Sequence, residues 1–211
     1  MVQSKDIDTF CRFIRVSRET IASLKYYENH LKTASKSLNL VGKTTINDVW
    51  IRHFLDSAQV IDFIDKNDNS LVDIGSGAGF PGIVLAIILK ERKNKIKIRL
   101  IEKSKKKINF IKEIINKLKL DVTAVNQNVF EQKQKILDDV IVARAFKPLE
   151  IILELIHKKA SNWKKIFLFL GKTGNEQLLQ ASKNWDFKYK QRMSITSSDS
   201  KIIEIYKLIK K

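Results

Sequence analysis

The sequence is poor in the residues that build disulfides and metal sites, with one cysteine and three histidines among 211 residues. A single cysteine, Cys11, excludes an internal disulfide and fits a reducing compartment. The histidines, His30, His53 and His157, show no metal-ligand spacing with it, so no metal site is expected. Long apolar runs are also missing. The longest, residues 83–89, is too short to cross a bilayer, and the first ten residues lack the apolar core of a signal peptide. These absences favour a cytoplasmic protein without a membrane segment.

Acidic residues are also scarce relative to basic ones. Forty Lys and Arg against 23 Asp and Glu give a formal net charge of +17. An excess of this size favours a polyanionic partner such as nucleic acid. The alternative is a solubilising surface, since Lys, Ile and Asn are abundant together. The length fits one domain, and 44% hydrophobic residues suffice for a core.

The two parts of the chain, before and after residue 69, differ in the spacing of their apolar residues. Residues 1–65 read as helical, because apolar positions recur at helical spacing through 6–36. A second helix is expected to open at Thr45, with Asp48 completing a capping box. Beyond residue 69, short apolar runs alternate with helix-length segments. Strands are expected at 70–75, 95–102, 122–127, 139–146 and 165–171, and helices at 81–92, 104–119, 148–160 and 173–184.

The tail breaks this alternation. Strand-like runs at 186–195 and 201–208 are separated only by TSSDS, which suits an antiparallel hairpin. The alternation before it indicates a parallel sheet covered on both faces. The expected fold is therefore α/β and Rossmann-like, with a hairpin closing the sheet. Residues 66–211 would form this domain, and residues 1–65 a helical extension packed on it.

Glycine is rare, yet four of the seven glycines fall within residues 75–82, in the stretch LVDIGSGAGFPG (71–82). Such clustering indicates unusual dihedral angles or a ligand that approaches the backbone closely. The plainer alternative is a tight strand-to-helix turn without a ligand. Open α/β sheets bind ligands beyond the carboxyl ends of their strands, where this loop would lie.

Two ligands fit the glycine loop. From Gly77, GAGFPG matches the G-x-G-x-x-G pattern of dinucleotide sites, and from Asp73, DIGSGAG matches the D-x-G-x-G-x-G pattern of S-adenosylmethionine methyltransferases. Asp73 could interact with the cationic amino group of a methionine moiety but would repel dinucleotide phosphates. Glu102, at the end of the second strand, could accept hydrogen bonds from both ribose hydroxyls or pair with a surface lysine. The terminal hairpin favours S-adenosylmethionine, because it resembles the reversed last strand of the seven-stranded methyltransferase sheet.

Four motifs extend this interpretation: NLVGKTTINDVWIRHFLDS (39–57), DIGSGAGFPG (73–82), KKKINFI (105–111) and ARAF (143–146). With them the sequence resembles the bacterial 16S rRNA (guanine-N7)-methyltransferase G family, also called glucose-inhibited division protein B. The glycine loop alone would indicate only a methyltransferase, whereas its combination with RHFLDS and RAF is specific to the family. Two positions depart from the family's usual residues. Asn128 replaces an Arg, and Leu170 replaces a Lys, with Lys172 nearby.

The resemblance implies S-adenosylmethionine as cofactor and methyl transfer to N7 of one guanosine in 16S rRNA. No general base is expected, because guanine N7 has no proton to lose. Arg144 would lie beside the transferred methyl group, although an ion pair with a local carboxylate such as Asp138 is its structural alternative. The resemblance implies a cofactor site formed by Asp73, Gly75, Gly77, Gly79, Phe80, Glu102, Val129, Phe130 and Arg144.

The same resemblance and the basic composition imply an RNA surface on a monomeric protein, which would act on free rRNA, the small ribosomal subunit or an assembly intermediate. The expected contacts are Arg52, Lys105, Lys106, Lys107 and Lys172. The three consecutive lysines begin a helix, the unfavourable end for cations, which favours a use other than solvation. His53 is expected to be a packed helical histidine. Two other functions stay open: a methyltransferase for a different substrate, and a non-catalytic RNA-binding or assembly protein.

Overall fold

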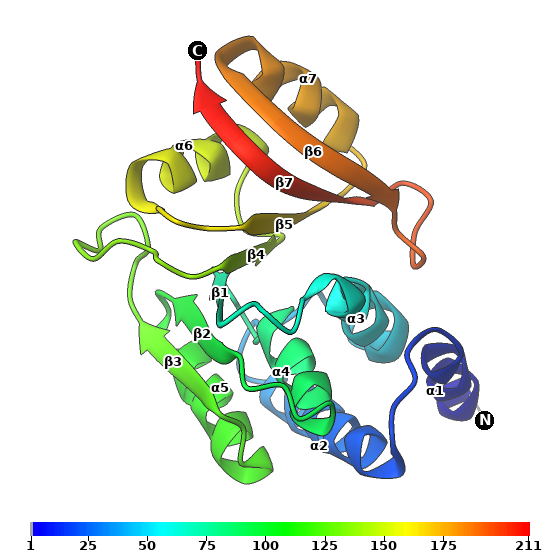
Figure 1. The fold of residues 1–211 in the computed structure, drawn as a ribbon. Coiled ribbons are helices and arrows are strands. Elements are labelled where there is room, and N and C mark those ends of the chain that lie inside the picture. The colour runs from blue at the N-terminus through cyan, green and yellow to red at the C-terminus, as the bar shows by residue number, and fades with distance from the viewer. Residues whose placement is uncertain (1) are drawn as a thin grey trace.

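A computed structural model describes residues 2–211, which fold around a seven-stranded sheet. The strand order is β3-β2-β1-β4-β5-β7-β6, and only β7 runs against its neighbours (Figure 1). This is the predicted parallel sheet with a terminal antiparallel hairpin. The strands are β1 (Ser70–Ile74), β2 (Lys97–Glu102), β3 (Val122–Asn126), β4 (Val140–Arg144), β5 (Lys165–Leu170), β6 (Trp185–Met193) and β7 (Lys201–Lys210).

Helices cover both faces of the sheet, as the alternating sequence predicts (Figure 1). α4 (Gly82–Glu91) and α5 (Lys105–Leu118) contribute to one hydrophobic core, and α6 (Leu149–Lys159) and α7 (Gly174–Asn184) to a second. Successive strand side chains point to opposite faces. In β1, Leu71 accordingly joins the first core and Val72 the second.

The N-terminal residues form a further layer outside α4 and α5. It consists of α1 (Val2–Phe13), α2 (Arg18–Ala34), the π-helix η1 (Trp50–Leu55), α3 (Asp56–Ala58) and the 3-10 helix η2 (Ile61–Phe63). α2 contacts both α4 and α5. The helical stretch predicted at 6–36 is two helices, because Ser17 has an extended backbone and its hydroxyl accepts a hydrogen bond from the Thr20 N–H. None of the helices in residues 2–211 has the length and hydropathy of a membrane span.

The predicted capping box at Thr45 and Asp48 is wrong. Residues 43–47 form turns, and helical backbone begins only at Val49. The Thr45 hydroxyl donates to the Gly42 carbonyl at 3.0 Å and contacts Nε2 of His53 at 3.0 Å. Thr45 is therefore used by a tertiary contact and by its own turn, which leaves its side chain unable to begin a helix.

Candidate active site

The carboxyl ends of β1, β2 and β4 open into one pocket of about 810 Å³. This volume lies within the range of about 300–1,000 Å³ that is typical of small-molecule sites. Its walls include the glycine loop after β1 and the loop between α2 and η1. The pocket is lined by many of the sequence-predicted residues: Gly75, Gly77, Phe80, Glu102, Lys107, Val129, Phe130 and Arg144.

The backbone of the glycine loop has dihedral angles that are unfavourable for residues other than glycine. Gly75, Gly77 and Gly79 have φ values of 73°, 60° and 103°, in the left-handed region. A Cβ atom on Gly75 would also overlap the ring of Phe146. The glycine motif and the RAF motif thus meet at this point. Gly79 does not line the pocket, and its missing side chain makes room for Ile83 and the hydroxyl of Tyr27.

Asp73 lies beneath the loop rather than in the pocket wall. It is completely buried, and its Oδ2 accepts a hydrogen bond from the Gly82 N–H at 2.8 Å. Its Oδ1 has no hydrogen-bond partner among the described residues. Burial raises the pKa of Asp73 to about 7. Asp73 therefore joins the end of β1 to the start of α4, and its free oxygen is covered in this structure.

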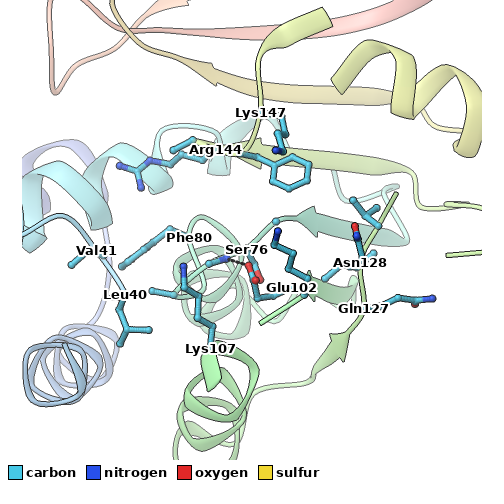
Figure 2. Close-up of a pocket in the computed structure, with 18 of the residues that line it drawn as sticks. Leu40, Val41, Ser76, Phe80, Glu102, Lys107, Gln127, Asn128, Arg144 and Lys147 are labelled. Atoms are coloured by element: carbon cyan, nitrogen blue, oxygen red, sulfur yellow. Dashed lines mark hydrogen bonds between the residues drawn. The ribbon is translucent and has the colours of Figure 1, made fainter. Parts of the chain in front are cut away.

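Glu102 ends β2 with its carboxylate at the pocket wall. Oε2 accepts from the Gly77 N–H at 3.0 Å (Figure 2), and Oε1 accepts from the Ser104 N–H at 2.8 Å. Among the described residues no lysine pairs with this carboxylate, so the surface alternative for Glu102 is not observed. An ionised carboxylate only accepts hydrogen bonds and offers about four lone-pair sites. Glu102 therefore retains acceptor capacity for hydroxyl groups of a ligand.

Beyond Glu102 the pocket becomes apolar. Val129 is buried, whereas Phe130 is 37% exposed and stacks on Phe146 with ring centroids 5.8 Å apart. Asn128, the departure from the family's usual Arg, lines the pocket and accepts from the Phe130 N–H at 3.1 Å through its Oδ1. This part of the wall is a flat apolar surface with amide groups at its edge, which suits a heteroaromatic ring.

Arg144, at the end of β4, is held by three groups from the RHFLDS motif. Its Nε donates to Asp56 Oδ2 at 2.6 Å, its Nη2 donates to the Arg52 carbonyl at 2.6 Å, and its Nη1 lies 3.3 Å from His53 Nδ1. The alternative of an ion pair for Arg144 is thus observed, but its partner is Asp56 and not Asp138, which pairs with Arg99. Sequence reasoning missed Asp56 as a site residue. Its partner Arg144 is 88 positions away, so the local sequence holds no signal of this contact.

His53 is a neutral, fully partnered histidine, as expected for a packed ring. Burial, and next the charge of Arg144, lower its pKa to about 3. Because a guanidinium only donates, we assign the His53 proton to Nε2, which donates to Thr45 Oγ1 at 3.0 Å. The imidazole stacks on Phe80 with centroids 4.9 Å apart, and both rings line the pocket.

The same carboxylate that holds Arg144 also binds the loop between β6 and β7. Asp56 Oδ1 accepts from Gln59 Nε2 at 3.0 Å and from Thr196 Oγ1 at 2.9 Å. Gln59 in turn accepts from the Ile195 N–H at 2.7 Å. The terminal hairpin therefore contributes to the position of Arg144, a relationship with no signal in the sequence.

The predicted RNA residues lie at different distances from the pocket. Lys107 is half-buried and lines it, whereas Lys105 and Lys106 are exposed at the start of α5. Arg52 is exposed on η1. Lys172 is outside the pocket lining, with 85% of its side chain exposed and its Nζ 3.6 Å from Asp199. Two further lysines, Lys103 and Lys147, also line the pocket.

Solved structures similar to this one share its fold. The M. capricolum TrmK structure in complex with S-adenosyl-homocysteine has a TM-score of 0.54 and 21% sequence identity, and the match covers 72% of this chain and 67% of that one. The 16S rRNA methylase RmtB also has a TM-score of 0.54, with 15% identity over 91% of this chain and 76% of that one. The fold is therefore the Rossmann-like fold of S-adenosylmethionine-dependent methyltransferases.

Sequence comparison is more specific. A family model described as rRNA small subunit methyltransferase G matches residues 20–206. A relative from Pelagibacter ubique (strain HTCC1062), named ribosomal RNA small subunit methyltransferase G, is 40% identical over 198 residues, 93% of this chain and 92% of the relative. A relative of the same name from Rickettsia akari (strain Hartford) is 37% identical over 197 residues, 93% of this chain and 99% of the relative. The chain belongs to the rRNA small subunit methyltransferase G family.

Proposed function

We propose that this chain transfers a methyl group from S-adenosylmethionine to N7 of one guanosine in 16S rRNA. Membership of the family makes the chain an S-adenosylmethionine-dependent rRNA methyltransferase. The identity of the base and of the methylated atom belongs to the proposal. The observation that carries it is the single pocket in which the glycine loop and Glu102 meet Arg144.

The residues along one part of the pocket fit the cofactor. Glu102 would accept hydrogen bonds from the ribose hydroxyls, since its carboxylate lines the wall and has acceptor capacity left. Val129 and Phe130 would border the adenine, and the backbone of Gly75 and Gly77 would face the methionine moiety. Asp73 would act mainly through the loop that it supports at Gly82. When bound, S-adenosylmethionine supplies a methyl group already activated on a sulfonium.

The surrounding residues support a reaction without proton transfer. Guanine N7 has a lone pair in the ring plane and no proton to remove. His53 stays neutral and its two ring nitrogens are occupied, so it is not poised as a general acid or base. Arg144 has five N–H donors, of which three are engaged by Asp56, Arg52 and His53, leaving two for the guanine O6 beside N7. Positioning of this kind supplies at most about 7–11 kcal/mol.

The pocket rim supports an RNA substrate. Lys103, Lys107 and Lys147 line the pocket, and Lys105 and Lys106 continue this charge along α5. Phosphate contacts by such side chains hold and orient RNA without reading its sequence. Arg52 and Lys172 would extend the contact from η1 and from the loop after β5. We place the reaction in the cytoplasm, with a monomer acting on free 16S rRNA, the small ribosomal subunit or an assembly intermediate.

Mass spectrometry of rRNA tests this function directly. Unmodified free 16S rRNA and unmodified small subunits would each be incubated with the purified protein and S-adenosylmethionine, then digested and mapped. One 7-methylguanosine at a single position is expected. A methyl group on another atom or another base would overturn the proposal. Cofactor binding without methylation of either substrate would instead favour the non-catalytic RNA-binding alternative.

A further inference from the structure

The pocket has two ends, and Val129 and Phe130, which would border the adenine, follow Asn128 at one of them. Figure 2 shows Gln127 and Asn128 on one side and Leu40 and Val41 on the other, with Ser76 and Glu102 between them. The Leu40 and Val41 end is built by the loop between α2 and η1, outside the sheet domain.

This second end combines apolar walls with hydrogen-bond donors. Leu40 and Phe80 are buried, with exposed fractions of 6% and 5%, and both line the pocket. The guanidinium of Arg144 lies 5.9 Å from the centroid of the Phe80 ring. A flat heterocycle fits this combination, because its faces pack on apolar groups and its edge accepts hydrogen bonds.

The backbone of the loop offers further donors. The Gly42 carbonyl accepts from both the N–H and the hydroxyl of Thr45, at 2.9 and 3.0 Å, which holds the loop in place. In contrast, none of the backbone N–H groups of residues 41–44 donates a hydrogen bond within the described part of the chain. The loop is thus held by the Gly42 carbonyl, whereas the N–H groups of Val41 and Gly42, two residues that line the pocket, have no partner among the described residues.

The charges at this end favour a neutral base over the methionine moiety of the cofactor. That moiety carries an amino cation and a carboxylate, and both need polar partners. The side chains of Leu40, Val41 and Phe80 are apolar, and the positive charge of Arg144 is already paired with Asp56. A nucleobase has no net charge at neutral pH, and its binding here would cost no unpaired ion.

We infer that residues 40–42 form one wall of the target-guanine site, opposite Phe80 and below the free N–H groups of Arg144. This inference rests on the proposed function, since it takes guanine as the methylated base. The N-terminal helices would then complete the active site as well as pack on the sheet. A target base would leave its RNA stack to enter this space, as with other enzymes that modify bases.

The first test is to fill the proposed base site without touching the cofactor residues. Val41→Trp is expected to lower the single-turnover rate of methyl transfer at least tenfold at saturating rRNA and cofactor. Affinity for S-adenosylhomocysteine by calorimetry should stay within twofold. The matched control is Leu179→Trp, which adds the same ring at a position that is 70% exposed on α7. Val41→Trp with the parent rate, or with lost S-adenosylhomocysteine affinity, would overturn the inference.

The second test uses the wild-type protein, so it does not depend on how a variant folds. An rRNA fragment with 6-thioguanosine at the methylated position would be irradiated with the protein and S-adenosylhomocysteine. A cross-link is expected in the tryptic peptide of residues 37–43, which lies between Lys36 and Lys43. Cross-links only to other peptides would overturn the inference alone. If the wild type methylates no guanosine in the parallel reaction, the proposed function fails and the inference falls with it.

Discussion

Arg144 Nε lies 2.6 Å from Asp56 Oδ2, and this contact joins the end of β4 to the N-terminal helices across 88 positions of sequence. The side chains are 17% and 14% exposed, so the pair is mostly withdrawn from water. Such a pair needs its remaining donors and acceptors satisfied. Asp56 meets this need through Gln59 and Thr196. Arg144 meets it in part through His53 and the Arg52 carbonyl, and two of its N–H groups have no partner among the described residues.

Although Asp56→Asn changes the shape of the side chain only slightly, it should therefore disturb the position of Arg144. We expect the free energy of unfolding to fall by about 1–3 kcal/mol, below the 3–5 kcal/mol of a fully buried pair because both groups keep some exposure. Methyl transfer should fall at least tenfold, while S-adenosylhomocysteine affinity changes little. The control is Asp62→Asn, whose carboxylate is 67% exposed beside Arg92 and should contribute less than about 1 kcal/mol. A parent methylation rate in Asp56→Asn would show that Arg144 does not depend on this anchor.

Gly75→Ala tests the link between the glycine loop and Phe146. The left-handed backbone at Gly75 costs an alanine about 1–2 kcal/mol, and the new methyl group would displace the Phe146 ring. Because Phe146 supports Phe130, calorimetry should show at least a tenfold loss of S-adenosylmethionine affinity. Gly171→Ala is the matched control, since no atom lies within 4 Å of its added Cβ. Equal affinities in the two variants would contradict this account of the loop.

Tyr27→Phe tests the support that α2 gives the same loop. The Tyr27 hydroxyl donates to the Ala78 carbonyl at 2.6 Å in a buried setting. Its removal leaves a buried acceptor unpaired and should lower the free energy of unfolding by about 1–3 kcal/mol. Tyr26→Phe serves as control, because its hydroxyl makes no hydrogen bond among the described residues. Denaturant titration of both variants compares them, and equal stabilities would mean that the contact contributes nothing.

The buried carboxyl of Asp73 should make stability depend on pH. Burial raises its pKa from 3.8 to about 7, so the folded protein binds this proton more tightly than the unfolded chain. Ionisation then disfavours folding, and this cost grows as the pH rises from about 4 to about 7. Relative to Asp73→Asn, the cofactor-free wild type should lose stability over this window, by at most about 1.4 kcal/mol per unit of pKa difference.

Urea titrations of both proteins at pH 4, 5.5 and 8 measure this difference in stability, and a constant difference would contradict the buried-charge account.

Asp73→Asn also tests the proposed role of Asp73 toward the cofactor. At pH 8, loss of the negative charge should weaken S-adenosylhomocysteine binding by about 1.5–3 kcal/mol if the charge serves the amino group. Unchanged affinity would restrict Asp73 to its contact with Gly82.

The lysines at the start of α5 should act on RNA through charge alone. Replacing Lys105, Lys106 and Lys107 with Gln should weaken RNA binding and flatten its logarithmic salt dependence by up to about 0.7–0.9 per lost phosphate contact. Cofactor affinity should hardly change. The control replaces Lys188, Lys190 and Lys207, which are exposed on β6 and β7, and alters net charge equally. If both triple variants shift the salt dependence alike, the lysines of α5 form only a solvated face.

Much of the fold could be predicted because its signals are local. Strand runs and helical periods placed every strand of the sheet within a few residues, as with β1 at Ser70–Ile74 for the predicted 70–75. The glycine loop and Glu102 could also be predicted. A positive φ favours glycine and a carboxylate at a strand end is an acceptor, so each signal lies in the residue type at a single position. The capping box predicted at Thr45 was wrong because this prediction considers only the local sequence, whereas the Thr45 side chain has a tertiary partner.

The amino-acid sequence was enough to predict the sheet, its hairpin, the family and the glycine loop. In contrast, the partners of Arg144, the burial of Asp73 and the place of Leu40 at the pocket depend on how the elements pack in three dimensions. Periodicity along the chain reports which face of an element is apolar, yet it carries no information on which distant side chains meet. Asp56 and Thr196 are 140 residues apart, and Gly75 and Phe146 are 71 apart, so their contacts arise only when the sheet and the N-terminal helices pack together.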